Sequence, residues 1–568
     1  MLRKALLATA AVLAAVFLWL LATLPARPAV TTGSVDDRIR RRTVAGAFHV
    51  HSTRSDGTAG REEIAAAASR AGLQFVVLTD HGDGTRPPDP PEYIHGVLMI
   101  DAVEISTNGG HYIALDMRPS PYPLGGEAAA VVEDVDRLGG FGIVAHGGSA
   151  KEDLRWTDWS LPVGGLEWLN LDSEWRDESR GRLARAGIDY MFRKGPALAT
   201  LLDRPAAVLE RLDLASRSAR HFVAVAGHDA HGGWTAEDGW PRILPRVPSY
   251  EGSFRAFAVR ALLDAEPSGR AADDARLLLV AFRAGSLFTA IDAIAGPAWV
   301  DYHATLPDGQ QYEMGPVLRF IEGTTLTFRS TLPKYARMVL MRDGAPVAES
   351  SFELLQATAP GPGGYRVEVT DPRAPGNPPV PWLVTNPIYL AVPPPAVVPS
   401  PIKFGNVRSL TEPVTIEKDT DSVATLTTDD APREGQIRRK VVAYRLGPRP
   451  RGSHYAALSV RMPADRPSFD AIEFTARASS PMRVSVQLRF DTLRGARWGR
   501  SVYVSPELRR HVVHLDRLVS LDRASKPPQM SSASSILFVV DLTNARPGGE
   551  GRFEISDLNL VSVVRSNR

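Results

Sequence analysis

Short apolar runs alternate with helical stretches along residues 44–295 of the chain. Runs such as residues 75–79 and 222–227 have the length of buried strands. Between such runs, residues 62–71 have a strong helical composition and end at Gly72, and residues 128–138 form a similar stretch that ends at two glycines. This alternation of strands and helices predicts a parallel α/β domain over residues 44–295.

After residue 296 the pattern changes to short strands separated by turns rich in Gly and Pro. Residues 296–392 predict a small β-sandwich domain, and the proline-rich residues 393–402 predict a stiff, extended linker. Alternating strands resume over residues 403–568 and predict a jelly-roll-like β-domain. The expected fold is therefore an α/β domain followed by two all-β domains.

The first residues combine a positive charge with a long apolar run from residue 5 to residue 24. A membrane span needs about 20 apolar residues, whereas the core of a cleavable signal has about 7–15. Arg3 and Lys4 predict that this end stays in the cytoplasm while the remainder is exported. We expect residues 1–30 to be a membrane anchor facing the periplasm or cell exterior, with a cleaved signal as the alternative, and residues 31–43 to be a polar tether.

Length, charge and cysteine content narrow the function classes. A chain of 568 residues exceeds what one hydrophobic core supports, so several domains are expected. The net charge of +2 without a basic block gives no indication of a nucleic-acid partner. The absence of cysteine excludes disulfides, thiolate metal ligands and cysteine nucleophiles.

His, Asp and Glu residues stand at or near the ends of the apolar runs in residues 44–295. One such residue is ordinarily a hydrogen-bonded structural group, but a repeated pattern of them at strand ends indicates a metal site of several ions. Their nitrogen and oxygen atoms suit Zn, Mn or Fe. The candidate ligands are His49, His51, Asp56, His81, Glu104, His111, His146, Asp229 and His231.

The order of these motifs resembles the PHP (polymerase and histidinol phosphatase) metallohydrolase superfamily. The resemblance covers residues 44–295 and implies a distorted (β/α)7 barrel. Residues 285–288 and 385–389 look similar to the exported branch that includes carbaryl hydrolase. A classical amidohydrolase barrel is the rival interpretation, but it needs a bridging Lys where this chain offers Glu104. The motifs are His49-Val50-His51-Ser52, Asp56-Gly57, Thr79-Asp80-His81, Glu104, His111, Ala145-His146 and Asp229-Ala230-His231.

The resemblance implies two or three divalent cations at three positions, with Glu104 as a bridge between the first two. Two departures from the family pattern, Gly147 after His146 and His228 before Asp229, concern the shape of the pocket. The implied ligand sets are His49, His51, Glu104 and Asp229 for the first position, Glu104, His111 and His146 for the second, and Asp56, His81 and His231 for the third.

A hydrolase mechanism follows from such a cluster. Bound cations lower the pKa of water toward about 7 and polarise the substrate oxygen, so a Ser or Cys nucleophile is not required. The implied activity is hydrolysis by a metal-bridging hydroxide, with a phosphate ester of the cell envelope as the favoured substrate. The alternative is a carboxylic or carbamic ester hydrolase of the carbaryl-hydrolase type, acting on a small molecule.

Several other polar residues are weaker candidates. Arg54 and Lys151 could bind a phosphate oxygen, and Arg54 could also act in catalysis, although a solvated role suits both equally well. His228 is a candidate general acid, with a structural role as the alternative. Asp80 is expected to orient a ligand imidazole. Glu167 and Asn170 stand at a further strand end and are candidates to line the pocket.

Aromatic residues suggest two further roles. The insertion at residues 151–218 contains four tryptophans, for which packing is favoured over a pocket wall. In the C-terminal β-domain, Trp498 and Tyr503 are candidate sugar-stacking residues, because the domain resembles carbohydrate-binding modules. A non-catalytic, carbohydrate-binding envelope protein is therefore the alternative to an enzyme. The four tryptophans are Trp156, Trp159, Trp168 and Trp175.

Overall fold

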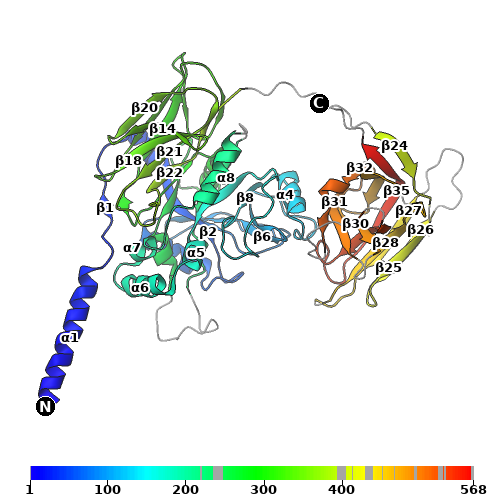
Figure 1. Cartoon of the computed structure of the whole chain (residues 1–568), viewed down its shortest axis with the longest axis horizontal. Coiled ribbons are helices and arrows are strands. Elements are labelled where there is room, and N and C mark those ends of the chain that lie inside the picture. The colour runs from blue at the N-terminus through cyan, green and yellow to red at the C-terminus, as the bar shows by residue number, and fades with distance from the viewer. Residues whose placement is uncertain are drawn as a thin grey trace. The chain divides into compact units, whose positions relative to one another are not determined.

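The computed structural model divides into two compact units (Figure 1). The first contains residues 1–82, 88–118 and 135–394, and the second contains residues 83–87, 119–134 and 395–568. The predicted linker at residues 393–402 lies outside the described residues. The residues described are 2–217, 221–233, 247–392, 404–411, 413–428, 439–450, 452–465, 467–491, 496–521, 529 and 532–563.

Two sheets carry the strand ends of interest in the first unit. One has the order β10-β9-β8-β7-β6, and the other contains the run β12-β11-β2-β3-β5-β4. Bridges from Val50 to Ala230 and from His81 to Glu104 connect the two sheets. The strands are β2 (Thr43–Val50), β3 (Phe75–Leu78), β4 (Glu92–Ile94), β5 (Val97–Asp101), β6 (Val103–Thr107), β7 (Gly110–Leu115), β8 (Phe141–Val144), β9 (Gly165–Asn170), β10 (Val223–Gly227), β11 (Ala258–Leu262) and β12 (Leu287–Ala290).

The expected (β/α)7 barrel is not shown, because only part of this arrangement is parallel. The pairs β2–β3, β3–β5, β8–β9 and β9–β10 are parallel. The pairs β6–β7, β7–β8, β11–β2 and β11–β12 are antiparallel. A parallel pair needs a long crossover, and the two residues between β6 and β7 leave room only for a hairpin. The unit is mixed α/β with a large share of strand.

The two helices predicted from sequence are confirmed with small shifts at their ends. Helix α3 (Arg61–Ala71) ends at Gly72, whose left-handed backbone lets its N–H reach the carbonyls of Ala68 and Ser69. Helix α4 (Ala128–Arg137) follows the second prediction. The shorter helix α9 (Tyr250–Phe254) and helix α10 (Ala271–Ala284) complete the framework around β11 and β12.

The insertion at residues 151–218 is mainly helical, and two of its tryptophans are core residues. Trp156 and Trp168 are fully buried, and Trp168 Nε1 donates a hydrogen bond to Thr289 Oγ1 over 3.2 Å. These two residues bear out the packing interpretation rather than a pocket wall. The helices are α5 (Leu171–Arg176), α6 (Arg180–Tyr190), α7 (Lys194–Ala199) and α8 (Ala206–Arg217).

The β-region after residue 296 is continuous with the first unit rather than a separate domain. Strand β22 pairs with β12, which places Thr385 opposite Phe288. The Asn386 side chain binds the backbone N–H and carbonyl of Ala224. The strands are β13 (Ala295–Gly296), β14 (Val300–Thr305), β15 (Gln311–Glu313), β16 (Val317–Arg319), β17 (Thr325–Ser330), β18 (Arg337–Arg342), β19 (Ala345–Ser350), β20 (Leu354–Thr358), β21 (Gly363–Thr370), β22 (Leu383–Thr385) and β23 (Ile388–Ala391).

The N-terminal region is more ordered than a tether. Helix α1 (Leu2–Ala22) contains a 20-residue stretch, Arg3–Ala22, that is long and apolar enough to cross a membrane and has a mean hydropathy of 2.5. After it, strand β1 (Ala29–Val30) pairs with β13, and helix α2 (Asp37–Arg42) packs Ile39 against Leu262. The predicted tether is therefore folded against the first unit.

The part of the second unit after residue 404 is built mainly of strands, as predicted, with two six-stranded antiparallel sheets that share one apolar core. Trp498 packs against this core, and the Tyr503 ring lies 6.4 Å from the Tyr122 ring between centroids. Both rings are partly buried, and their sugar-stacking role stays a prediction. The strands are β24 (Phe404–Ser409), β25 (Val414–Lys418), β26 (Val423–Thr428), β27 (Lys440–Arg445), β28 (Tyr455–Arg461), β29 (Ala471–Ala478), β30 (Met482–Phe490), β31 (Arg497–Val504), β32 (Arg509–His514), β33 (Val519–Ser520), β34 (Ala533–Asp541) and β35 (Glu550–Val563).

A buried ion-pair network joins the helical insertion to the later β-region of the first unit. The Arg366 guanidinium on β21 is almost fully buried and pairs with Asp213 of α8 and with Glu368 over 2.7 Å. Arg204 binds the same Glu368 carboxylate over 2.7 Å. Removing one member of a buried ionic group leaves the others without compensation.

We expect Arg366→Met to lower the free energy of unfolding by about 3–5 kcal/mol, because the buried Glu368 and the partly buried Asp213 then lose this cation. The same change at Arg337, whose pair with Glu349 is more than half exposed, should cost under about 1 kcal/mol. Chemical denaturation followed by tryptophan fluorescence measures both. Equal effects of the two changes would contradict the assigned role of the network.

Candidate metal centre

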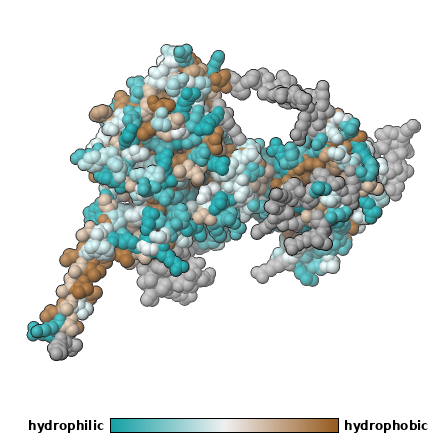
Figure 2. All heavy atoms as spheres, viewed as in Figure 1, coloured by the Kyte–Doolittle hydropathy of each residue, from teal (hydrophilic) through white to brown (hydrophobic). Residues whose placement is uncertain are grey.

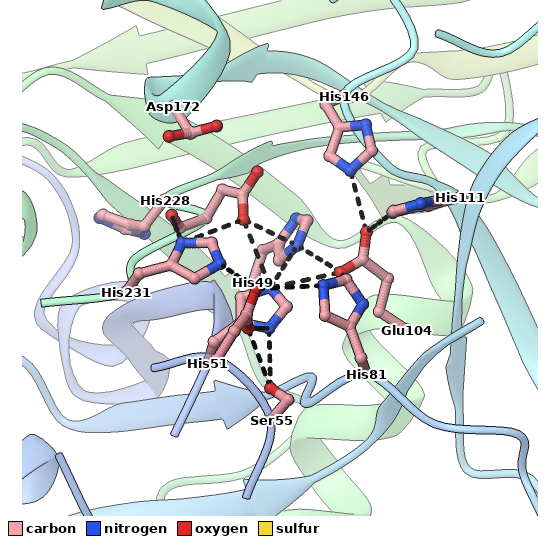
Figure 3. A network of polar contacts seen from close by, with 12 residues as sticks. His49, His51, Ser55, His81, Glu104, His111, His146, Asp172, His228 and His231 are labelled. Atoms are coloured by element: carbon pink, nitrogen blue, oxygen red, sulfur yellow. Dashed lines mark hydrogen bonds and ion pairs between the residues drawn. The ribbon is translucent and has the colours of Figure 1, made fainter. Parts of the chain in front are cut away.

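Four ligand atoms from three distant segments converge at the C-terminal end of β2 (Figure 3). His49 Nε2 lies 3.1 Å from His51 Nε2. Each of these nitrogens lies 3.3 Å from Glu104 Oε2 and 3.3 Å from Asp229 Oδ1. All four side chains are buried. They are the set expected from sequence for the first metal position.

These distances fit a bound cation. Four ligands at 2.0–2.1 Å from a tetrahedral ion are separated by about 3.3 Å, the edge of that tetrahedron. Two imidazole nitrogens and two carboxylate oxygens at this spacing present a set of lone pairs that a divalent ion can accept. The donor set therefore suits a cation such as zinc, manganese or iron.

The two oxygens of the Glu104 carboxylate face different groups of imidazoles. Oε2 faces the set around His49 and also lies 3.2 Å from His81 Nδ1. Oε1 lies 2.8 Å from His111 Nδ1 and 2.9 Å from His146 Nε2. A carboxylate divided in this way can bridge two cations. The structure thus brings together the expected second set as well.

The third expected set meets at the more exposed side of the cluster. Asp56 Oδ2 lies 3.3 Å from His231 Nε2 and 3.5 Å from His81 Nε2. The side chains of these three residues are between 30% and 53% exposed. All nine candidate ligands are therefore found in one cluster, and its Asp56 side is where a substrate can approach.

The charges of the cluster depend on one another. Burial alone would lower the pKa of His49, but the carboxylates of Asp229, Glu167 and Glu104 raise it well above its usual value. Burial would likewise raise the pKa of Glu104, but His49, His111 and His146 hold it well below the usual range. The carboxyls stay ionised and attract positive charge, which either protons or metal cations can supply.

Glu167 orients the imidazole ring of His49. Its Oε1 accepts a hydrogen bond from His49 Nδ1 over 2.7 Å, and its Oε2 accepts from the backbone N–H of His146 over 2.6 Å. Asn170 Nδ2 also donates to Oε2 over 2.8 Å. A Cβ at Gly227 would lie 1.7 Å from Glu167 Oε1, so glycine at that position leaves room for the carboxylate. The sequence places Glu167 and Asn170 at a strand end but does not indicate this orienting role.

The structure changes the expected role of Asp80. Its carboxylate accepts hydrogen bonds from the Ser52 N–H and hydroxyl, each over 2.7 Å, and from the Ser55 hydroxyl over 2.8 Å. Ser55 Oγ in turn lies 3.3 Å from His51 Nδ1. Asp80 therefore supports His51 through a serine, because the loop after β2 folds back between the two side chains.

Three other candidates have partners that favour different roles. Arg54 donates to Asp101 over 2.9 Å and pairs with Asp89, so its charge is already balanced. His228 is buried between the carbonyls of Phe48 and Phe257, and burial lowers its pKa to about 4, which favours a structural role over a general acid. Lys151 lies in an exposed turn beyond His146 and remains a candidate for substrate binding.

Local backbone geometry and one nearby carboxyl were not evident from the sequence. His49, His146 and Asp229 have φ angles of 64°, 31° and 48°, a left-handed conformation that non-glycine residues rarely adopt and that concentrates at functional sites. Burial raises the pKa of Asp172, and the Asp229 charge adds to this effect. Asp172 accepts a hydrogen bond from Trp175 Nε1 over 2.8 Å.

No family model matches this chain, and none of the curated proteins matches it. Among solved structures, it is similar to a two-domain protein containing a predicted PHP-like metal-dependent phosphoesterase from Bacteroides vulgatus, with 12% identity, 63% of this chain and 99% of that chain covered, and a TM-score of 0.27. It is also similar to the family 11 carbohydrate-binding module of the cellulosomal cellulase Lic26A-Cel5E of Clostridium thermocellum, with 11% identity, 30% and 100% coverage, and a TM-score of 0.24. At these TM-scores neither similarity supports a conclusion about the fold or function of this chain. Neither similarity tests the predicted relationship to the exported carbaryl-hydrolase-like branch.

We expect Glu104→Gln to reduce the metal content of the purified protein by at least half, because the bridge loses its charge at both positions. His95→Ala is the control, since His95 is half exposed and pairs with Glu62 away from the cluster. Elemental analysis by mass spectrometry gives the metal per chain. Unchanged metal in Glu104→Gln would contradict the bridging role.

We also expect cation affinity to increase from about pH 6 to about pH 8, because a cation must displace protons from imidazoles. The pKa values of His49, His51, His146 and His231 are raised, so this competition should persist above the ordinary histidine pKa of 6.5. Titration calorimetry in buffers of different ionisation enthalpy measures the protons released. Affinity that is constant across this range would contradict the expectation.

Proposed function

We propose that this protein is a metal-dependent hydrolase whose reaction takes place at the cluster around Glu104. The observation that supports this most strongly is the division of the Glu104 carboxylate between two groups of imidazoles, at 2.8–2.9 Å on Oε1 and 3.3 Å on Oε2. A single cation would not need a buried carboxylate shared in this manner. Hydrolytic enzymes use pairs of adjacent cations to activate water and to stabilise the charge that develops when an ester is cleaved.

The roles of the residues follow from their positions. His49, His51, Asp229 and Glu104 would hold the most buried cation, and Glu167 fixes the ring of His49. Cations held by these residues would lower the pKa of water and polarise the substrate oxygen, which would remove the need for a side-chain nucleophile. Asp56, His81 and His231 form the exposed edge, where the ester would enter.

A phosphate ester is the proposed substrate class. Three neighbouring cation positions can neutralise an anion with several oxygens, and the most exposed set faces the entrance. The carboxylic or carbamic ester alternative is favoured by one observation: the charge of Arg54 is already balanced by Asp89 and Asp101. Recognition of phosphate would therefore depend on the cations and on Lys151.

We also propose that α1 anchors the protein in the membrane and that both units lie on the exported side. The Arg3–Ala22 stretch has the required length and hydropathy, and the positive residues before the apolar run favour a cytoplasmic start. The substrate would then be a small-molecule or envelope-derived ester.

Turnover of p-nitrophenyl phosphate, bis-p-nitrophenyl phosphate and p-nitrophenyl acetate by the metal-loaded protein tests this function. We expect phosphate-ester turnover that His49→Ala abolishes and that Glu167→Gln lowers by about 10–100-fold, since Glu167 only positions a ligand. His95→Ala should retain wild-type kcat/KM, because His95 lies outside the cluster.

Each contrary outcome has a distinct meaning. Turnover of acetate alone would favour the carboxylic or carbamic ester alternative. Phosphate-ester turnover that survives His49→Ala would contradict the assignment of the site. Metal bound with no turnover of these three esters would favour a binding protein, and retention on envelope polysaccharide by the His49→Ala variant would then support the carbohydrate-binding alternative.

A further inference from the structure

The last turns of helix α1 contact the first unit through side chains, in addition to the covalent connection along the backbone. Figure 1 shows α6 and α7 beside the end of α1 that enters this unit. Arg185 of α6 donates to the Thr23 carbonyl over 2.6 Å, and its guanidinium lies 5.3 Å from the Trp19 ring centroid. The Phe17 and Phe192 ring centroids lie 6.5 Å apart. Phe192 belongs to the short turn between α6 and α7.

The length of the apolar stretch determines the depth of these contacts. A hydrocarbon core about 30 Å thick needs about 20 helical residues at 1.5 Å each. Arg3–Ala22 supplies 20 residues, so the whole stretch is needed to cross the hydrocarbon core. Phe17 is five residues before Ala22 and therefore lies about 7–8 Å inside the boundary when α1 spans. A side chain in contact with Phe17 must lie at or below that boundary as well.

The surface around Phe192 is apolar, as a position inside the hydrocarbon core requires. Ile188, Met191 and Phe192 are exposed by 44%, 62% and 47%, although all three are large and apolar. Figure 2 shows α1 as a brown rod that meets the first unit, with a teal outer tip. Exposed apolar side chains beside a spanning helix are protected from water when they enter the lipid with it.

Basic residues lie close to the chain just after α1. Arg193 donates to the carbonyl of Pro25, just after α1. Arg27, Arg193 and Lys194 line a cavity of about 470 Å³ together with Arg255 and Arg260. Asp292, which also lines it, pairs with Arg260 over 2.5 Å, and Glu251 pairs with Arg255 over 3.0 Å and with Lys194 over 3.9 Å, so the five cations still exceed the two carboxylates. A basic cavity next to the membrane boundary complements the phosphates of anionic lipids.

The connection to the anchor is too short for the unit to move away from the bilayer. Residues 23–28 separate α1 from β1, which is paired with β13. Within this short segment Thr23 and Pro25 are already held by Arg185 and Arg193.

We propose that the corner formed by Ile188, Met191 and Phe192 is embedded in the outer leaflet of an anionic bilayer beside α1. This inference rests on the proposed anchor, and it gives the first unit a fixed orientation on the membrane instead of free movement on a tether. The basic cavity lined by Arg27, Arg193 and Lys194 then lies at the level of the lipid phosphates.

The absence of native cysteine allows a direct test with single labels. The full chain carrying Met191→Cys or Phe192→Cys is labelled with an environment-sensitive fluorophore and reconstituted in vesicles of phosphatidylethanolamine and phosphatidylglycerol. Lipids with a spin label near the headgroup serve as quenchers. Phe17→Cys marks the span, and Val280→Cys on α10, exposed by 46%, is the matched apolar control.

We expect a blue-shifted emission and quenching by the labelled lipids at positions 17, 191 and 192, and neither effect at position 280. Because Met191 is the most exposed of the three corner residues, its variant provides the result even where Phe192→Cys fails to fold. Quenching at position 17 with water-like emission at 191 and 192 would overturn the embedded corner and leave the anchor in place. Loss of the label at position 17 by cleavage during export would overturn both.

Discussion

The buried Glu104 carboxylate is the group on which the rest of the site depends. Its two oxygens are surrounded by imidazoles from β2, β7 and the ends of β3 and β8, and it is almost fully buried. An isolated carboxylate would be neutral in such surroundings, because burial strongly disfavours its charge. The neighbouring histidines reverse this effect and hold the pKa of Glu104 well below its usual range.

That requirement explains much of the local architecture. The two sheets that carry the candidate ligands are connected by a bridge between His81 and Glu104 and by another next to His51, between Val50 and Ala230. The left-handed backbone at His49, His146 and Asp229 directs their side chains toward the same point. Such strain persists where surrounding contacts over-determine it, and here Glu167 binds both His49 and the backbone of His146.

The later β-region stabilises this arrangement from a distance. Pairing of β12 with β22, the Asn386 contacts to Ala224 and the Arg366 network fasten residues after 296 to the strands that carry the ligands. Two short segments on which the sequence-based expectation of an exported branch depends, residues 285–288 and 385–389, are neighbours in this pairing. Their positions indicate a role in holding the sheet rather than in binding substrate.

The sequence by itself determined the nine ligand candidates, their position at strand ends, the helices near residues 62–71 and 128–138, the all-β C-terminal region and the apolar length of α1. Each of these depends on local composition or periodicity, which a linear pattern records directly. The tertiary structure alone decided that Glu104 divides its oxygens, that Glu167 orients His49, that Arg54 is engaged by Asp89 and Asp101, that β22 continues the first sheet, and that Phe192 reaches Phe17. These features depend on contacts between residues far apart in the chain, and such contacts arise from packing, which no local pattern encodes.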